Sequence, residues 1–222
     1  MINIYKNINP AVSIIMATYN RARYLNRSID SLLSQTFKDW ELLVVDDGSD
    51  DNSFELINKY LPDHENIRYL KHQRRKLAFS RNVGITASIG EYITFLDSDD
   101  EYDKNHLKFR IDFMQGRPDV DLIHGGIQVI GNPYVVDKDN PDKTIHLEQC
   151  VIGGTFFGRR KVFIELKGFS SISYSEDSEF LERAKEKFAV QKVGYPTYIY
   201  HRDAEDSITN QRLNNLNKQV DE

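Results

Sequence analysis

The sequence contains one cysteine, no long hydrophobic run and no excess of positive charge. Cys150 alone rules out an internal disulfide and a cysteine-based zinc site, so we expect a reducing compartment and a small, buried apolar role for this thiol. No window approaches the roughly 18 consecutive apolar residues that a spanning helix needs, and the first residues, MINIYKNINP, lack a signal-peptide apolar region. These absences predict a cytoplasmic protein, either soluble or peripherally associated with the inner face of the membrane.

The charge balance excludes one class of partner. The 34 acidic residues outnumber the 29 basic residues, which gives a formal net charge of −5. A general nucleic-acid binder neutralises many phosphates with clustered Lys and Arg, so we do not expect nucleic acid as a partner. An acidic protein that binds an anionic ligand needs a cation beside it.

The first half of the chain alternates short β-branched apolar runs with segments of helical spacing. This pattern is typical of βα units around a parallel sheet. The predicted strands are residues 12–16, 42–45, 67–70 and 92–96. The predicted helices lie around residues 25–33, 52–60, 77–88 and 104–116, and the second of these begins with Asn52 and Glu55 at capping-box spacing.

The second half is less regular. An apolar run at 122–130 predicts a strand, and the polar, proline-bearing segment 131–143 predicts a loop or hairpin excursion. Further expected elements are a strand at 155–158, helices at 161–166 and 178–187, strands near Val190 and Tyr198, and a weakly attached polar helix after Asn210. The chain is thus predicted to be one α/β domain with a Rossmann-like, mostly parallel sheet flanked by helices and a mixed α+β C-terminal part.

Polar residues follow three of the predicted strands. They are Thr18-Tyr19-Asn20, Asp46-Asp47-Gly48-Ser49 and Asp97-Ser98-Asp99-Asp100. Ligands of open parallel sheets bind outside the carboxyl ends of the strands, so we expect these loops on one rim. Turn preferences explain either acidic stretch alone. Both on one rim require a cation, because neighbouring carboxylates repel each other and raise one another's pKa.

The expected cation is Mg²⁺ or Mn²⁺. An oxygen-only ligand set without a nearby His or Cys cluster favours these ions, which complete their coordination with phosphate oxygens and water. A calcium-binding EF-hand is excluded, because Tyr102 would stand in place of the required Gly and Lys108 in place of the bidentate Glu.

Five ordered segments resemble the family 2 glycosyltransferases of the GT-A fold. They are VSIIMATYNRARYLNRSIDSLLSQTFKDWELLVVDDGSDD, SRNVGI, GEYITFLDSDD, GGTFFGRRKVFIELKGF and SEDSEFLERA. Each segment is weak alone, but their order makes the resemblance specific. It implies a single GT-A domain over residues 1–222, with a nucleotide-sugar-binding half at 10–100, an acceptor-binding half at 101–210 and a C-terminal tail at 211–222.

The resemblance implies roles on the donor side. Tyr19 would stack on the nucleotide base, Asp47 would accept a hydrogen bond from a uracil-type imide, and Arg81 would bring positive charge to the nucleotide or its diphosphate. Asp99 of the DXD motif would be the direct metal ligand, with Asp97 near the ribose or in the outer shell of the metal. The implied nucleotide-sugar site comprises Thr18, Tyr19, Asn20, Asp47, Arg81, Asp97 and Ser98.

The resemblance also implies roles on the acceptor side. Asp177 matches the general base of the family, and Glu176 neighbours the acceptor. Gly153 and Gly154 resemble the small-residue loop at the acceptor site, where a missing side chain leaves room for sugar. His201 lies in a segment that folds back over the site in relatives, which makes it a further candidate metal ligand.

Simpler interpretations of these residues stay open. First-turn acids stabilise a helix through its macrodipole, which explains Glu176 and Asp177 without catalysis. Gly153-Gly154 fits an ordinary turn and His201 an ordinary surface strand. A solvated loop accounts for the basic run at 74–76 better than a diphosphate or membrane contact does.

The activity that the resemblance implies is a metal-dependent, inverting, hexosyltransferase-type transfer. A sugar would move from a nucleotide-diphosphate donor, most commonly UDP-linked, to the hydroxyl of a saccharide or lipid-linked saccharide acceptor in polysaccharide or glycolipid biosynthesis. The alternative is a non-catalytic nucleotide-sugar or carbohydrate-binding module of the same fold.

Other enzyme classes fit less well. A Rossmann dehydrogenase needs GxGxxG after the first strand, where TYNRAR stands, and a P-loop needs Lys-Ser/Thr where Arg159 and Arg160 stand. A glycoside hydrolase would need two carboxylates that face each other across a sugar. Asp99 and Asp177 could be misread as such a pair.

Overall fold

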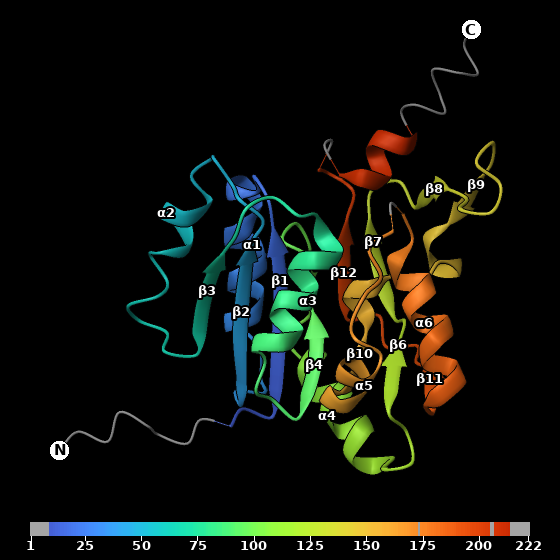
Figure 1. The fold of residues 1–222 in the computed structure, drawn as a ribbon, viewed down its shortest axis with the longest axis horizontal. Helices are drawn as coiled ribbons and strands as arrows, with labels where there is room; N and C mark the ends of the chain where they lie inside the picture. The colour runs from blue at the N-terminus through green and yellow to red at the C-terminus, as the bar shows by residue number, and fades with distance from the viewer. Residues whose placement is uncertain (1–8, 173, 205–206, 214–222) are drawn as a thin grey trace, which may run out of the picture.

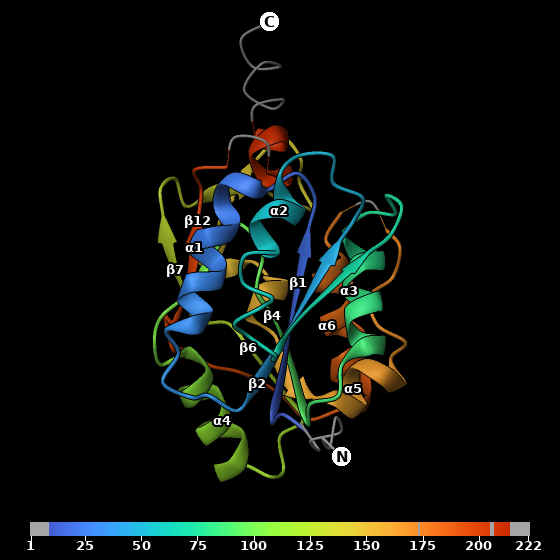
Figure 2. The same cartoon turned by 90° about the vertical axis from the view of Figure 1, so that its left-hand side faces the viewer.

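A seven-stranded sheet runs through the centre of the molecule, with helices on both faces (Figures 1 and 2). The computed structural model describes residues 9–172, 174–204 and 207–213. The strand order is β11-β6-β10-β4-β1-β2-β3. These strands are β1 (Val12–Thr18), β2 (Trp40–Asp46), β3 (Ile67–Lys71), β4 (Tyr92–Phe95), β6 (Leu122–His124), β10 (Phe157–Arg159) and β11 (Val190–Lys192).

The sheet is mostly parallel, as predicted. β1 pairs in parallel with β2 and β4, and β2 pairs in parallel with β3. β10 is the exception, because it runs antiparallel to both β4 and β6. The carboxyl ends of β1, β2 and β4 therefore lie at the same edge of the sheet, where the three polar loops begin.

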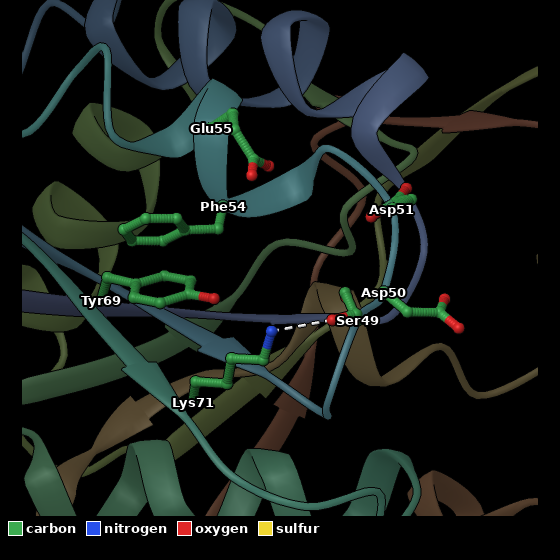
Figure 3. A pocket seen from close by; sticks show the side chains of 7 residues that line it. All are labelled: Ser49, Asp50, Asp51, Phe54, Glu55, Tyr69 and Lys71. Atoms are coloured by element: carbon green, nitrogen blue, oxygen red, sulfur yellow. Dashed lines mark hydrogen bonds between the residues drawn. The ribbon is translucent and has the colours of Figure 1, made fainter.

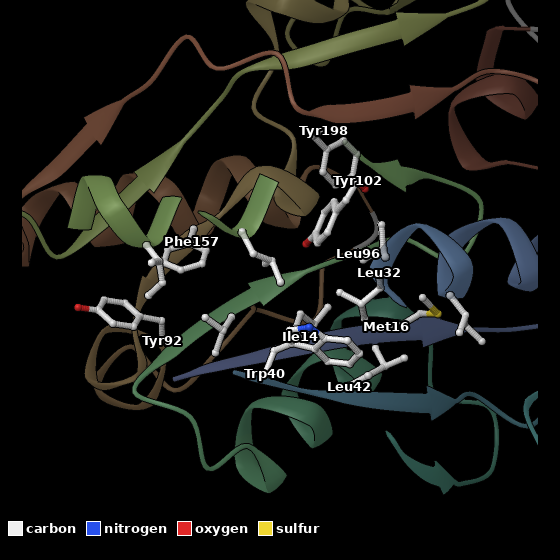
Figure 4. Packing of buried hydrophobic residues seen from close by; sticks show 14 of the residues in the cluster. Ile14, Met16, Leu32, Trp40, Leu42, Tyr92, Leu96, Tyr102, Phe157 and Tyr198 are labelled. Carbon is white, nitrogen blue, oxygen red and sulfur yellow. The ribbon is translucent and has the colours of Figure 1, made fainter. Parts of the chain in front are cut away.

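Alternation along the buried strands builds one core on each face of the sheet. In β1, Ile14 and Met16 belong to one cluster and Ile15 to the other, since successive side chains point to opposite faces. The cluster with Ile14 includes Trp40, Leu42, Leu96 and the ring of Tyr198, as Figure 4 shows. Burial on both faces explains why these strands read as continuous apolar runs.

Six helices flank the sheet among the described elements. They are α1 (Ala22–Leu33), α2 (Ser53–Ile57), α3 (Leu77–Ala87), α4 (His106–Gly116), α5 (Arg160–Glu165) and α6 (Glu176–Lys187). α1 buries Leu25, Ile29 and Leu32 at helical spacing, and α4 buries Leu107, Ile111 and Met114 in the same cluster. In Figure 2, α1 and α4 lie on one side of the sheet and α3, α5 and α6 on the other.

A small second sheet completes the site-bearing end of the molecule. It has the order β5-β12-β7, with β5 (Glu101–Tyr102), β7 (Ile127–Ile130) and β12 (Tyr198–His201). A separate hairpin joins β8 (Tyr134–Val136) to β9 (Thr144–His146), which confirms the hairpin alternative for 131–143. Two 3₁₀ turns follow, η1 (Leu147–Gln149) and η2 (Gly153–Thr155).

Several sequence-based boundaries were wrong. The apolar run at 122–130 is broken between β6 and β7, because Gly125 and Gly126 both have positive φ and turn the chain into the second sheet. The predicted 155–158 strand begins at Phe157, after η2. α6 starts at Glu176 and not at 178, so Glu176 and Asp177 are inside its first turn.

The second helix is also shorter than predicted. α2 ends at Ile57, and turns occupy the residues up to the predicted end at 60. Asn52 makes no side-chain cap hydrogen bond; instead the carboxylate of Asp51 accepts hydrogen bonds from the backbone N–H (3.0 Å) and the hydroxyl (2.5 Å) of Ser53. The capping-box prediction therefore named the wrong residue.

Two further expectations concern single features. Cys150 is partly exposed and not fully buried. Residues 208–213 are helical, while the rest of the predicted C-terminal helix lies outside the described residues. Among the helices that the structure describes, none combines the length and the apolarity needed to cross a membrane.

Candidate functional site

The loops after β1 and β2 are joined by side-chain and backbone hydrogen bonds. The amide of Asn20 donates to Oδ1 of Asp50 (2.7 Å), and the backbone N–H of Asp50 donates back to Oδ1 of Asn20 (3.0 Å). The backbone N–H of Asn20 donates to the Ser49 hydroxyl (3.0 Å), and Asn20 has a positive φ of 52°. Asn20 thus fixes the two loops to each other, a task that suits Asn because it tolerates left-handed backbone.

Asp47 is buried at the end of β2 and holds the loop that follows β3. Its backbone N–H donates to the carbonyl of Thr18 (2.9 Å). Its carboxylate accepts the backbone N–H groups of Arg75 (2.5 Å) and Lys76 (2.9 Å). His72 and Arg74 lie 3.6 and 3.8 Å from the same carboxylate. Asp47 is therefore engaged by protein donors, while the hydroxyl of Thr18 is buried without a hydrogen-bond partner.

Tyr19 is partly exposed beside Asp47, and the guanidinium carbon of Arg74 lies only 3.2 Å from the centroid of its ring. The run at 74–76 is therefore not a simple solvated loop, because Arg74 stacks on an aromatic face of the rim.

The DSDD loop after β4 concentrates negative charge. Burial, with the charge of Asp97 beside it, raises the pKa of Asp99 to about 6, although Arg21 lies 3.8 Å away. Burial together with Asp99 and Asp97 raises the pKa of Asp100 well above its usual value. Ser98, which separates Asp97 from Asp99 in the sequence, is buried as well. The loop is thus built at an electrostatic cost that a bound cation would offset.

Asp100 positions the second sheet against this loop. Its carboxylate accepts the hydroxyl of Tyr198 (2.8 Å) and the backbone N–H of His201 (2.8 Å). The Tyr198 hydroxyl also lies 3.4 Å from Oδ2 of Asp97. Nε2 of the His201 ring lies 3.2 Å from the carboxylate of Glu101. The backbone of His201 therefore contacts the DSDD loop, and its ring faces Glu101.

The donor chemistry of this loop fits a hard divalent cation. Asp97 and Asp99 offer carboxylate oxygens, and the raised pKa of Asp99 marks a carboxylate without full compensation. Within residues 9–172, 174–204 and 207–213, no three His, Cys, Asp or Glu side chains are already grouped as a metal site.

Arg81 joins the DSDD loop to the N-terminus of α6. It is buried in α3, with one nitrogen 2.9 Å from Oδ1 of Asp97 and another 3.2 Å from Oε1 of Glu176. Burial alone lowers the pKa of Arg81, but the two carboxylates raise it above its usual value. Arg81 is a buried charge that links the DSDD loop to α6, two segments that lie far apart in the sequence.

Asp177 lies next to this ion-pair cluster. Its carboxylate accepts the backbone N–H of Gly153 (3.1 Å) and that of Ser178 (2.8 Å). Burial, and then the charge of Glu176, raise the pKa of Asp177 to about 6, and Arg81 opposes this rise. A carboxyl whose pKa is raised to about 6 is charged at neutral pH and can accept a proton there, as a general base must.

The two glycines of η2 allow close packing around this carboxyl. A Cβ on Gly153 would lie 2.8 Å from a guanidinium nitrogen of Arg81, and a Cβ on Gly154 would overlap the hydroxyl of Tyr198. The space that the missing side chains leave is taken up by these two groups of the protein.

Sequence reasoning missed several residues that hold the site together. Arg27 of α1 forms an ion pair with Asp203 (2.7 Å), approaches Glu101 (3.9 Å) and donates to the carbonyl of Asp99. Together with Tyr198 and Asp100, it fastens the chain after β12 to the DSDD loop. A single arginine in an amphipathic helix and a tyrosine in an apolar run carry no sequence signal for such a role.

Two open hollows lie beside the rim. One, of about 430 Å³, lies between α2 and β3. There the ring of Phe54 is tilted against that of Tyr69, and the Lys71 ammonium donates to the Ser49 carbonyl, as Figure 3 shows. The other, of about 400 Å³, is lined by residues around the start of α6, among them Tyr174, Ser175 and Ser178. Neither is lined by Asp99 or Asp177.

Comparisons with known proteins agree with this arrangement. The model of glycosyl transferase family 2 matches residues 13–167. The UDP-Glc:α-D-GlcNAc-diphosphoundecaprenol β-1,3-glucosyltransferase WfgD of Escherichia coli is 35% identical over 147 residues, which are 64% of this chain and 57% of WfgD. The chain covers as little as 14% of other curated relatives, so it corresponds to only part of such proteins.

Solved structures share the fold. S. aureus TarS 1-349 in complex with UDP-GlcNAc superposes with a TM-score of 0.74 at 22% identity, over 90% of this chain and 60% of that one. The mannosyltransferase PcManGT from Pyrobaculum calidifontis, in complex with GDP-Man and Mn²⁺, gives 0.69 at 18% identity, over 86% and 56%. The GT-A fold expected from the sequence is confirmed, and the match of the family model over most of the chain places this protein in glycosyl transferase family 2.

Proposed function

We propose that the chain is an inverting, metal-dependent glycosyltransferase that moves a sugar from a nucleotide diphosphate, UDP in particular, to an acceptor hydroxyl. The observation that carries this proposal is the buried Arg81, which contacts Asp97 of the DSDD loop and Glu176 of α6 at once. Arg81 thereby connects the DSDD loop, which is suited to hold a cation, with the start of α6, which carries the proposed base Asp177.

The nucleotide half of the proposal uses residues 10–100. Tyr19 offers a ring for base stacking, Asp47 an acceptor for the imide of uracil, and Thr18 a buried hydroxyl without a partner in the protein. Asn20 and Ser98 shape the loops around them. Arg81 supplies positive charge toward the diphosphate while its own ion pairs fix its position.

The metal would be held by Asp99, with Asp97 in its outer shell and His201 as a further ligand. Mn²⁺ or Mg²⁺ bound there would stabilise the negative charge that develops on the diphosphate leaving group. The raised pKa of Asp99 supports this assignment, as does the Mn²⁺ in PcManGT, a protein of the same fold.

Asp177 would act as the general base. Its carboxylate takes the proton of the acceptor hydroxyl as the oxygen attacks the anomeric carbon, and the bond to the diphosphate breaks on the opposite side. A single displacement of this kind inverts the configuration at that carbon. Gly153 and Ser178 hold the carboxylate by backbone N–H groups, which fix its orientation and leave lone pairs for the acceptor.

Residues 101–210 would bind the acceptor near Glu176 and the turn of Gly153 and Gly154, whose missing side chains leave room for Arg81 and Tyr198 rather than for sugar. WfgD is named for a lipid-linked GlcNAc acceptor, and TarS was solved with UDP-GlcNAc. We therefore propose a saccharide or lipid-linked saccharide acceptor in polysaccharide or glycolipid biosynthesis, reached at the cytoplasmic face of the membrane.

Asp177→Asn tests this function against a non-catalytic binding module of the same fold. The proton acceptor is lost while the shape is kept, so sugar transfer from the UDP-sugar that the wild type uses, measured as UDP release, should fall by about 10²- to 10⁴-fold. UDP affinity should be unchanged. Asp119→Asn, at an exposed acid paired with Arg117, is the matched control. Wild-type protein that binds UDP-sugars and releases no UDP with any saccharide acceptor would favour the module.

A further inference from the structure

The segment 72–76, between β3 and α3, covers the part of the rim on which a nucleobase would stack. Arg74 is the residue that reaches Tyr19, with its guanidinium carbon 3.2 Å from the ring centroid. Atoms in van der Waals contact lie about 3.5 to 4 Å apart, so a base cannot enter between the guanidinium and this face of the ring. The stacking face that the proposed function needs is therefore already occupied.

The same segment occupies the second group that would recognise the base. The carboxylate of Asp47 accepts the N–H groups of Arg75 and Lys76, and it lies 3.8 Å from a nitrogen of Arg74. Arg74 therefore contacts the ring and lies near the carboxylate that a uracil would contact. Its planar guanidinium imitates a base, because it stacks through its face and donates N–H groups at its edge.

Arg74 is free to leave this position at low cost. Its side chain is 51% exposed, so it can turn into solvent without opening the core, and the backbone bonds from 75 and 76 to Asp47 need not break. The neighbouring Arg75 rests elsewhere, with its guanidinium carbon 4.6 Å from the centroid of the Phe79 ring. Of these two adjacent arginines, only Arg74 is placed on the rim aromatic.

We propose that Arg74 is a self-occluding residue of the donor site, which holds the nucleobase position until a nucleoside diphosphate displaces it. The inference rests on the proposed function, since it takes Tyr19 as the base-stacking ring. Only the fraction of molecules with Arg74 turned away can bind the base, so the residue lowers the apparent affinity by that fraction. It also shields Tyr19 and Asp47 from non-cognate ligands that cannot compete with a guanidinium.

The test is a calorimetric titration of the full chain with UDP, in the presence of Mn²⁺. Removal of the competing side chain in Arg74→Ala should lower the Kd by about fivefold, the size expected for an exposed cation–π contact. Arg75→Ala removes the same charge one residue away and serves as the control. It should bind UDP no more tightly than the wild type does.

A second pair of variants ties the effect to the ring. In a Tyr19→Ala background there is no ring to cover, so adding Arg74→Ala should give no gain in affinity. Equal or weaker UDP binding by Arg74→Ala, relative to Arg75→Ala, would overturn the inference while leaving the proposed function intact. Failure of every variant to bind UDP would overturn both.

Discussion

The carboxyl of Asp177 combines two environments that act in opposite directions on its proton. Burial and the negative charge of Glu176 favour the neutral form, whereas Arg81 and two backbone N–H groups favour the charged form. The balance raises the pKa to about 6. A base with this pKa is deprotonated at neutral pH and still holds a proton firmly enough to take it from a hydroxyl during attack.

The pH dependence of the reaction should follow this group. Because a general base acts only when deprotonated, the proposed role of Asp177 predicts that kcat/KM falls about tenfold per pH unit below pH 6. Glu176→Gln removes the neighbouring negative charge that raises the pKa, so the acidic limb should move to lower pH. A pH profile of UDP release for both proteins measures this shift. An acidic limb that stays at the same pH in Glu176→Gln would assign the titration to another group.

Single residues show how far the sequence could predict the site. Asp47 and Asp97 could be proposed from the sequence because each follows an apolar run, where ligands bind in this kind of sheet. Asp177 was proposed only from the family resemblance. The contacts of Arg81 with Asp97 and Glu176 could not be predicted, because they bridge elements that only the tertiary fold brings together. The contact between Asp100 and Tyr198 could not be predicted for the same reason.

At the scale of elements, hydrophobic periodicity predicted the middle of each helix or strand better than its ends. β1, β2 and α1 were predicted to within three residues at each end, because their apolar positions are buried against a neighbour at regular spacing. Boundaries that depend on turns were less accurate. The Gly125-Gly126 break between β6 and β7 is set by backbone conformation, which a hydrophobic pattern does not record.

The turn η2 gives a prediction at this scale. A methyl group on Gly154 would overlap the hydroxyl of Tyr198, which is itself held by Asp100. Gly154→Ala should therefore lower the free energy of unfolding by about 1 to 3 kcal/mol, as overpacked cores do. It should also weaken UDP binding in the presence of Mn²⁺, because Tyr198 contacts Asp97.

Chemical denaturation measures the first effect and calorimetry the second. Gly116→Ala is the matched control, because a Cβ at that position meets nothing within 4 Å. Its stability should change by less than about 1 kcal/mol, in the stabilising direction. If Gly154→Ala were as stable as this control, Tyr198 would not be packed as the structure has it.

At the scale of the whole molecule, three sets of contacts hold the loops of the candidate site together. Asn20 fixes the loops after β1 and β2, Asp100 holds β12 to the DSDD loop, and Arg81 links that loop to α6. The site is therefore assembled from segments spread over the whole described chain. Its fold class was predictable from sequence, whereas this assembly depends on long-range packing.

We propose that the DSDD loop and the neighbouring rim at Tyr19 and Asp47 bind one nucleoside diphosphate together with a cation. The most direct test is a calorimetric titration with UDP, with Mn²⁺ or with EDTA, of the wild type and of Asp99→Asn. The wild type should bind UDP saturably with Mn²⁺, and the Kd should rise about tenfold or more with EDTA or in Asp99→Asn. Absence of UDP binding to the wild type, or the same Kd under all these conditions, would contradict the account.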